Sequence, residues 1–158
     1  MHITFEQVLA NEEIHTYIEQ SDAVLLSMGY TEHSFPHVMR VAELTHKILT
    51  TLNYPKRDCE LACIAAYLHD MGNMINRHNH AQNGALLAFD LLKQMHAEPN
   101  DIALIMTAIG NHDEGTAFPV DPITAALILA DKSDVRYTRV RNQDFATFDI
   151  HDRVNYAV

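Results

Sequence analysis

The sequence predicts an all-α fold, a helical bundle formed by a single domain over residues 1–158. Apolar residues recur at the 3.6-residue spacing of amphipathic helices in successive segments, and no segment shows the alternation of a half-buried strand. Helix-start signals separate these segments, with Ser34 before Pro36 and Asp121 before Pro122 as the clearest examples. A chain of 158 residues buries roughly two thirds of its unfolded surface in one core, so it needs no disulfide or structural zinc.

Seven helices are expected, each begun or ended by a capping residue or a proline. Thr4 and Gln7 form a capping-box pattern before the first helix, and Gly29 is expected to end the second. The fourth helix has almost no polar face, so it should lie at the centre. Beyond residue 134 the periodicity fades, and we expect a tail without a regular helix over about 135–158. The expected helices span Phe5–Ala10, Asn11–Met28, Ser34–Leu52, Pro55–His69, His80–Met95, Pro99–Gly110 and Asp121–Ser133.

The end of the fourth helix carries the most informative residues of the chain, the adjacent His69 and Asp70. Neighbouring residues inside a helix point about 100° apart, but at a helix end both side chains can reach one ion. Gly72 is expected to supply a positive φ just past this end. The alternative is a capping histidine followed by a turn aspartate. His151-Asp152 is a second such pair, and because no apolar helix precedes it, nothing in the sequence singles it out.

Composition and charge exclude several classes of function. A formal charge of −10 argues against general nucleic-acid binding, because phosphate backbones are bound by Lys and Arg patches. The longest apolar run, residues 125–130, is far shorter than the roughly 20 residues of a membrane span, and no signal peptide opens the chain. Cys59 and Cys63 lie four residues apart on one helix face and are expected to be reduced thiols. We therefore expect a cytoplasmic protein, and the sequence does not decide between a monomer and a homodimer.

Several histidines and aspartates fall at the ends of the expected helices, where bundles build metal sites. Imidazole and carboxylate ligands without thiolates favour Fe, Mn, Zn, Co, Ni or Mg over a structural zinc site. Four of these residues suffice for one ion, and two more histidines, with Asp70 as a bridge, allow a second. The set for one ion is His37, His69, Asp70 and Asp131, and the additional pair is His80 and His112.

Other polar residues near these positions are weaker candidates. His78 is a rival of His80 but is better explained as a loop histidine, and Asp113 is either a ligand or a loop acid. The remaining histidines are expected at the surface: His2, His15, His33, His46 and His96.

The ordered pattern His…His-Asp…His…His…Asp resembles the HD-domain superfamily of metal-dependent phosphohydrolases, from about Ser34 to Asp134. The resemblance implies an HD-domain-like helical bundle, a first metal at His37, His69, Asp70 and Asp131, and a second at His80 and His112. The matching segments are His37-Val38-Met39-Arg40-Val41, Leu68-His69-Asp70-Met71-Gly72-Asn73, His80-Ala81-Gln82-Asn83-Gly84-Ala85, Ile109-Gly110-Asn111-His112 and Leu129-Ala130-Asp131-Lys132.

The sequence also departs from one branch of this superfamily, the cyclic-dinucleotide phosphodiesterases. Asp113 stands where that branch has a second histidine, and Asn73 stands where it usually has lysine. Its Gly-Tyr-Pro element is only faintly echoed by Ala117-Phe118-Pro119. We therefore do not predict activity on cyclic dinucleotides.

The expected function is hydrolysis of a phosphoester or phosphoanhydride of a nucleotide or another small phosphorylated metabolite by metal-activated water. Asp70 would orient the water, and Lys132 and Arg40 would neutralise phosphate charge. The basic residues that follow either line an outer phosphate path or pair with nearby acids; these are Arg136, Arg139 and Arg141. Two other functions stay open, a di-iron oxygenase and a non-catalytic, metal-loaded module that senses a nucleotide.

Overall fold

The computed structural model describes residues 2–158, and all regular structure in that range is helical. Each of the seven expected helices forms close to its expected bounds, which confirms the all-α prediction. Three short 3-10 helices and one further α-helix complete the chain. The elements are α1 Phe5–Leu9, α2 Glu12–Ser27, α3 Phe35–Thr51, α4 Lys56–Leu68, η1 Met71–Met74, α5 His80–Gln94, α6 Pro99–Gly110, α7 Pro122–Ser133, η2 Tyr137–Arg139, η3 Phe145–Thr147 and α8 Ile150–Tyr156.

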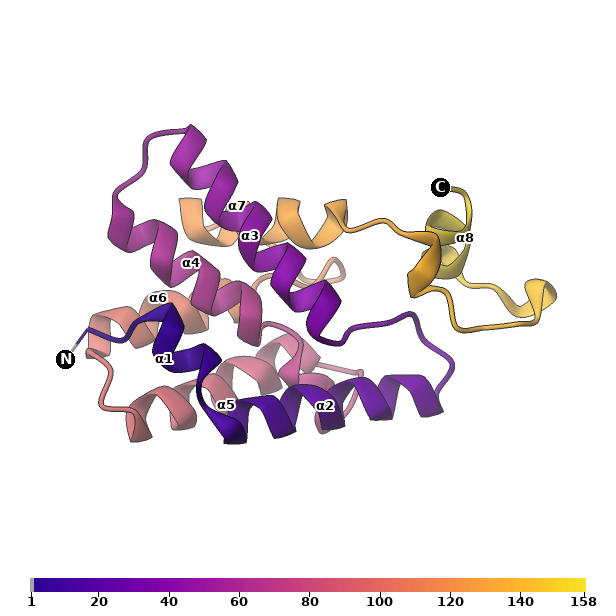
Figure 1. The fold of residues 1–158 in the computed structure, drawn as a ribbon, viewed down its shortest axis with the longest axis horizontal. Coiled ribbons are helices and arrows are strands. Elements are labelled where there is room, and N and C mark those ends of the chain that lie inside the picture. The colour runs from indigo at the N-terminus through magenta and orange to yellow at the C-terminus, as the bar shows by residue number, and fades with distance from the viewer. Residues whose placement is uncertain (1) are drawn as a thin grey trace.

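Helix α4 lies at the centre of the bundle and packs against α1, α3, α6 and α7 (Figure 1). Its residues from Leu61 to Leu68 are buried on every side, as its sequence predicts. Both cysteines on this helix are buried free thiols, and burial raises the pKa of Cys63 to about 12. The helix therefore anchors the residues that follow it at a fixed place in the core.

The start of α5 lies directly against the end of α4. A Cβ at Gly72 would overlap the His80 carbonyl oxygen and lie 2.5 Å from the Gly84 nitrogen. A Cβ at Gly84 would lie 3.2 Å from the His69 carbonyl oxygen. The expectation that Gly72 adopts a positive φ is wrong, because among the described glycines only Gly29 does so. Gly72 is instead required by the close approach of two backbones.

The C-terminal segment contains a helix that the sequence analysis missed. Asp149 accepts a hydrogen bond from the backbone N–H of Asp152, and the Asp152 carboxylate accepts one from the backbone N–H of Asp149, which forms a capping box for α8. The segment, coloured yellow, lies at one end of the bundle (Figure 1). Its attachments include a bond from the Glu32 N–H to the Arg139 carbonyl at 2.8 Å and an Arg141–Asp22 ion pair at 2.6 Å. No described helix is long and apolar enough to span a membrane.

Candidate metal centre

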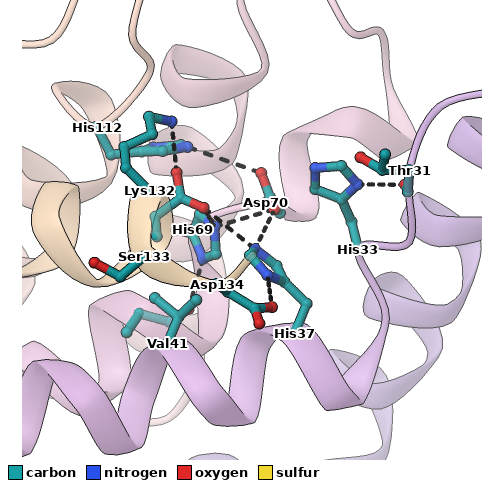
Figure 2. A network of polar contacts seen from close by, with 12 residues as sticks. Thr31, His33, His37, Val41, His69, Asp70, His112, Lys132, Ser133 and Asp134 are labelled. Carbon is teal, nitrogen blue, oxygen red and sulfur yellow. Dashed lines mark hydrogen bonds and ion pairs between the residues drawn. The ribbon is translucent and has the colours of Figure 1, made fainter. Parts of the chain in front are cut away.

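Five separate elements bring all six expected ligands to one place. His37 lies in the first turn of α3, His69 and Asp70 end α4, and His80 begins α5. His112 follows α6, and Asp131 lies in the last turn of α7. Figure 2 shows that His37, His69 and His112 all point toward Asp70. Helix ends supply every one of these residues, in agreement with the sequence analysis.

His37 and His69 form the first group of donors, together with Asp70 and Asp131. The His37 Nε2 lies 3.4 Å from Asp70 Oδ2 and 3.3 Å from Asp131 Oδ1. The His69 Nε2 lies 3.0 Å from Asp70 Oδ2 and 3.6 Å from Asp131 Oδ1. Both Nε2 atoms and Asp70 Oδ2 are buried and have no hydrogen-bond partner. Buried polar atoms are normally paired, so three unpaired atoms converging on one point fit a cation.

A second group of donors faces the other oxygen of Asp70. Its Oδ1 lies 3.7 Å from His80 Nε2 and 3.8 Å from His112 Nε2. Asp113 Oδ1 lies 3.8 Å from the same His80 nitrogen, which places this acid within reach of a shared ion. The two Asp70 oxygens thus serve different groups. This arrangement is suited to two cations joined by one carboxylate.

Hydrogen bonds at the far side of each imidazole set its tautomer. The Nδ1 atoms of His69, His80 and His112 lie 2.6, 3.0 and 2.7 Å from the carbonyl oxygens of Ala66, Arg77 and Ile109. A carbonyl only accepts, so each Nδ1 carries a proton, and in the neutral form of each ring Nε2 holds the lone pair that binds a cation.

Asp134 sets the tautomer of His37 by a hydrogen bond of the same kind. It was not named as a site residue by the sequence analysis. Its Oδ2 accepts a hydrogen bond from His37 Nδ1 at 2.8 Å, and its Oδ1 accepts one from Arg136 Nε at 2.7 Å. The partners His37 and Arg136 hold the pKa of Asp134 well below its usual value against the effect of burial. This ionised carboxylate therefore orients the first ligand.

The charges at the centre suit cation binding. Burial would raise the pKa of Asp70 and Asp131, but His69 beside the first and His37 beside the second hold both pKa values well below the usual range. Burial lowers the pKa of His80 to about 4, so this imidazole is neutral at physiological pH. The centre thus offers two anionic carboxylates and a neutral nitrogen ligand.

Metal affinity is expected to rise with pH up to about pH 9. Burial alone would lower the pKa values of His37 and His69. The carboxylates of Asp131, Asp134 and Asp70 outweigh it at His37, and those of Asp70 and Asp131 outweigh it at His69, which raises the two pKa values to about 9 and about 10. A cation bound by the first group must displace these protons, which corresponds to about tenfold in affinity per pH unit per proton. Mn²⁺ titrations of the metal-free protein at several pH values test this, and a pH-independent affinity would contradict it.

The raised pKa values of His37 and His69 also affect the stability of the metal-free fold. Metal affinity rises with pH, whereas this stability falls. Both pKa values lie above the 6.5 of an unperturbed histidine. Their contribution to the free energy of unfolding is therefore fully present below pH 6.5 and is lost as the pH rises through about 9 and about 10. Melting curves recorded with a chelator should show this decline.

A cavity of about 330 Å³ opens onto the centre. Lys132 lines it, with Nζ 2.7 Å from Asp131 Oδ2, and its role in neutralising phosphate charge stays a prediction. Arg40 does not line it; this exposed residue lines a separate groove with Glu43 and Ser133. Its position therefore gives no support to the catalytic role expected for it.

Other residues also line the cavity. Arg77, which was not expected there, and Arg139, for which an outer phosphate path and pairing with acids were both left open, supply positive charge. The position of Arg77 depends on loop packing that the sequence pattern does not encode. His33, expected at the surface, is half-buried and lies with its ring centroid 5.3 Å from that of His37. His151, which nothing in the sequence singled out, also lines the cavity. His78 is exposed. The other histidines expected at the surface are also exposed, and these are His2, His15, His46 and His96.

The chain is similar to a solved structure, to the sequence of another protein and to the model of one domain family. The crystal structure of a predicted HD superfamily hydrolase from an uncultured Thermotogales bacterium superimposes with a TM-score of 0.60 at 25% identity, over 77% of this chain and 66% of that chain. An uncharacterized protein of Methanocaldococcus jannaschii is 28% identical, over 70% of this chain and 51% of its own length. The chain thus spans about half the length of that relative. The model of the HD domain family matches residues 35–139, which include all six expected ligands, and the chain belongs to the HD domain family.

Proposed function

We propose that the protein is a metal-dependent phosphohydrolase that cleaves a phosphoester or phosphoanhydride of a nucleotide or another small phosphorylated metabolite. The observation that carries the proposal is the placement of Asp70, whose two oxygens face two different groups of histidines. The similarity to a predicted HD superfamily hydrolase supports hydrolysis as the type of reaction. When bound, divalent cations lower the pKa of water and polarise a phosphoryl oxygen.

The chain's own residues prepare the site for this reaction. The Asn73 amide donates a hydrogen bond to Asp70 Oδ1 at 3.2 Å, which fixes the plane of the carboxylate. Asp70 then orients the attacking water by accepting one of its protons in a hydrogen bond. Lys132 places a positive charge beside Asp131, where it attracts a phosphoryl oxygen and holds the phosphate against the centre.

The charge and size of the cavity support an anionic, small substrate. Its lining includes five acidic and three basic side chains, so its formal charge is −2 with the histidines neutral. Two divalent cations would change this to +2, and the phosphate would then be attracted only to the loaded protein. A volume of about 330 Å³ lies at the lower end of small-molecule sites, which favours a metabolite over a polymer.

The direct test is elemental analysis of the purified protein followed by a phosphate-release screen. Protein loaded with Mn²⁺ or Mg²⁺ should release phosphate from nucleotides or sugar phosphates without oxygen, and a chelator should stop the reaction. Lys132→Ala should weaken substrate binding without loss of metal. Activity that requires both iron and O₂ would instead identify an oxygenase. Micromolar nucleotide binding without turnover would identify a sensing module.

His112→Ala is expected to remove one of two bound ions and to leave the other in place. His112 Nε2 lies 3.8 Å from Asp70 Oδ1, and a ring nitrogen of His112 also lies within 4.8 Å of donor atoms of His69 and Asp131, but the first group retains His37, His69, Asp70 and Asp131 without it. The measurement is metal per protein by elemental analysis. His78→Ala is the matched control, because this histidine lies two residues from His80 and is exposed. An unchanged stoichiometry in His112→Ala would show that only one ion binds.

A further inference from the structure

The cavity has two chemically different parts. The bundle contributes all of its acids and three of its four imidazoles, the fourth being His151 of α8, whereas its three aliphatic side chains, Val135, Ile150 and Val154, all come from the C-terminal segment. Ile150 and Val154 are 65% and 45% exposed, although they adjoin a polar site. Exposed branched aliphatic residues beside a binding cavity favour contact with an apolar group of the ligand.

Polar contacts near both ends of α8 fix this apolar surface relative to the metal centre. His151 Nε2 lies 3.0 Å from Glu114 Oε1, and Glu114 in turn lies 3.5 Å from Lys132 Nζ. At the other end, Asn155 Oδ1 accepts a hydrogen bond from the Arg136 N–H at 2.8 Å. Ile150 and Val154 lie four residues apart and so share one face of the helix. The helix therefore presents a positioned surface to the cavity.

We propose that Ile150 and Val154 determine substrate specificity by contacting an apolar ring, such as a nucleobase, carried by the phosphorylated substrate. The inference rests on the proposed function, because it assigns the phosphate to the metal-ligand end of the cavity. The ring then lies against α8, where its contact removes apolar surface of both partners from water. Sugar phosphates without a ring of this kind make only the polar contacts.

Adenosine 5′-monophosphate and ribose 5-phosphate form the test pair, because they share the sugar and phosphate and differ in the base. Binding of each compound to the Mn²⁺-loaded protein is measured by calorimetry, and kcat/KM is measured on the same protein. The affinity for adenosine monophosphate should be at least about ten times the affinity for ribose 5-phosphate. Ile150→Asn and Val154→Asn should reduce this preference about tenfold, mainly through KM, and leave ribose 5-phosphate within about twofold. Asparagine removes the apolar contact without adding charge.

Val158→Asn is the matched control, since Val158 is a 69% exposed valine of the same segment that does not line the cavity. This variant should change neither the affinity nor kcat/KM for either compound. Equal affinity of the wild-type protein for the two compounds, or equal losses for both in the variants, would overturn the inference. A base preference in binding, together with no phosphate release from any compound of the nucleotide and sugar-phosphate screen, would instead sustain the role of α8 and refute the proposed hydrolase function.

Discussion

Asp70→Ala is expected to abolish both metal retention and phosphate release. Asp70 is the acid that faces all four histidines of the centre, through Oδ2 on one side and Oδ1 on the other. Loss of an outer partner of a metal ligand typically costs about 10- to 100-fold in affinity or activity. Loss of a carboxylate shared by two groups should exceed that range. Elemental analysis and the phosphate-release assay measure the two effects.

A control separates this result from simple unfolding. Asp70→Asn keeps the shape of the side chain and one acceptor oxygen but removes its charge, so it should also lose activity while melting closer to the wild-type temperature. Asp113→Ala should affect at most the second group, because Asp113 is near His80 but contributes nothing to the first group. Full activity in Asp70→Ala would remove Asp70 from the mechanism.

Gly72→Ala is expected to lower the free energy of unfolding by at least about 3 kcal/mol. The added Cβ would overlap the His80 carbonyl oxygen and lie 2.7 Å from its carbon, and these backbone atoms cannot rotate away as a side-chain end can. Separation of α4 from α5 would also move His80 away from Asp70. Urea denaturation measures the loss of stability, and elemental analysis should show reduced metal content.

Gly110→Ala is the matched control for this prediction. A Cβ at Gly110 would meet only the Ala85 Cβ, at an ordinary 3.7 Å, and the residue ends α6. The control should remain within about 1 kcal/mol of wild type. If Gly72→Ala unfolded at the wild-type urea concentration, the close approach of the two backbones would not limit the fold.

The fold could be predicted largely because its signals are local. Caps and prolines such as Asn11, Asp121 and Pro122 mark helix ends within a few residues, and the apolar spacing marks the buried faces. Helix α8 was missed because seven residues are too few to establish a period. Its capping pair, Asp149 and Asp152, was the available signal.

The six expected ligands could be named because their order along the chain resembles a known family, and the structure brings them together. The residues around them could not be named in the same way. Asp134 and Arg77 reach the site through the packing of loops and helix ends, and His33 is half-buried by the same packing. Arg40, one helical turn from His37, shows that proximity in sequence does not decide which groove a side chain enters.

The sharing of Asp70 between two groups of donors has a consequence for metal exchange. In the proposed two-metal centre, occupation of either position would neutralise part of the charge that attracts an ion to the other, and it would also fix the orientation of the common carboxylate. The two equilibria are therefore linked, and thermodynamics requires each ion to alter the affinity for its neighbour by the same factor. Metal uptake by this protein should deviate from the isotherm of two independent sites.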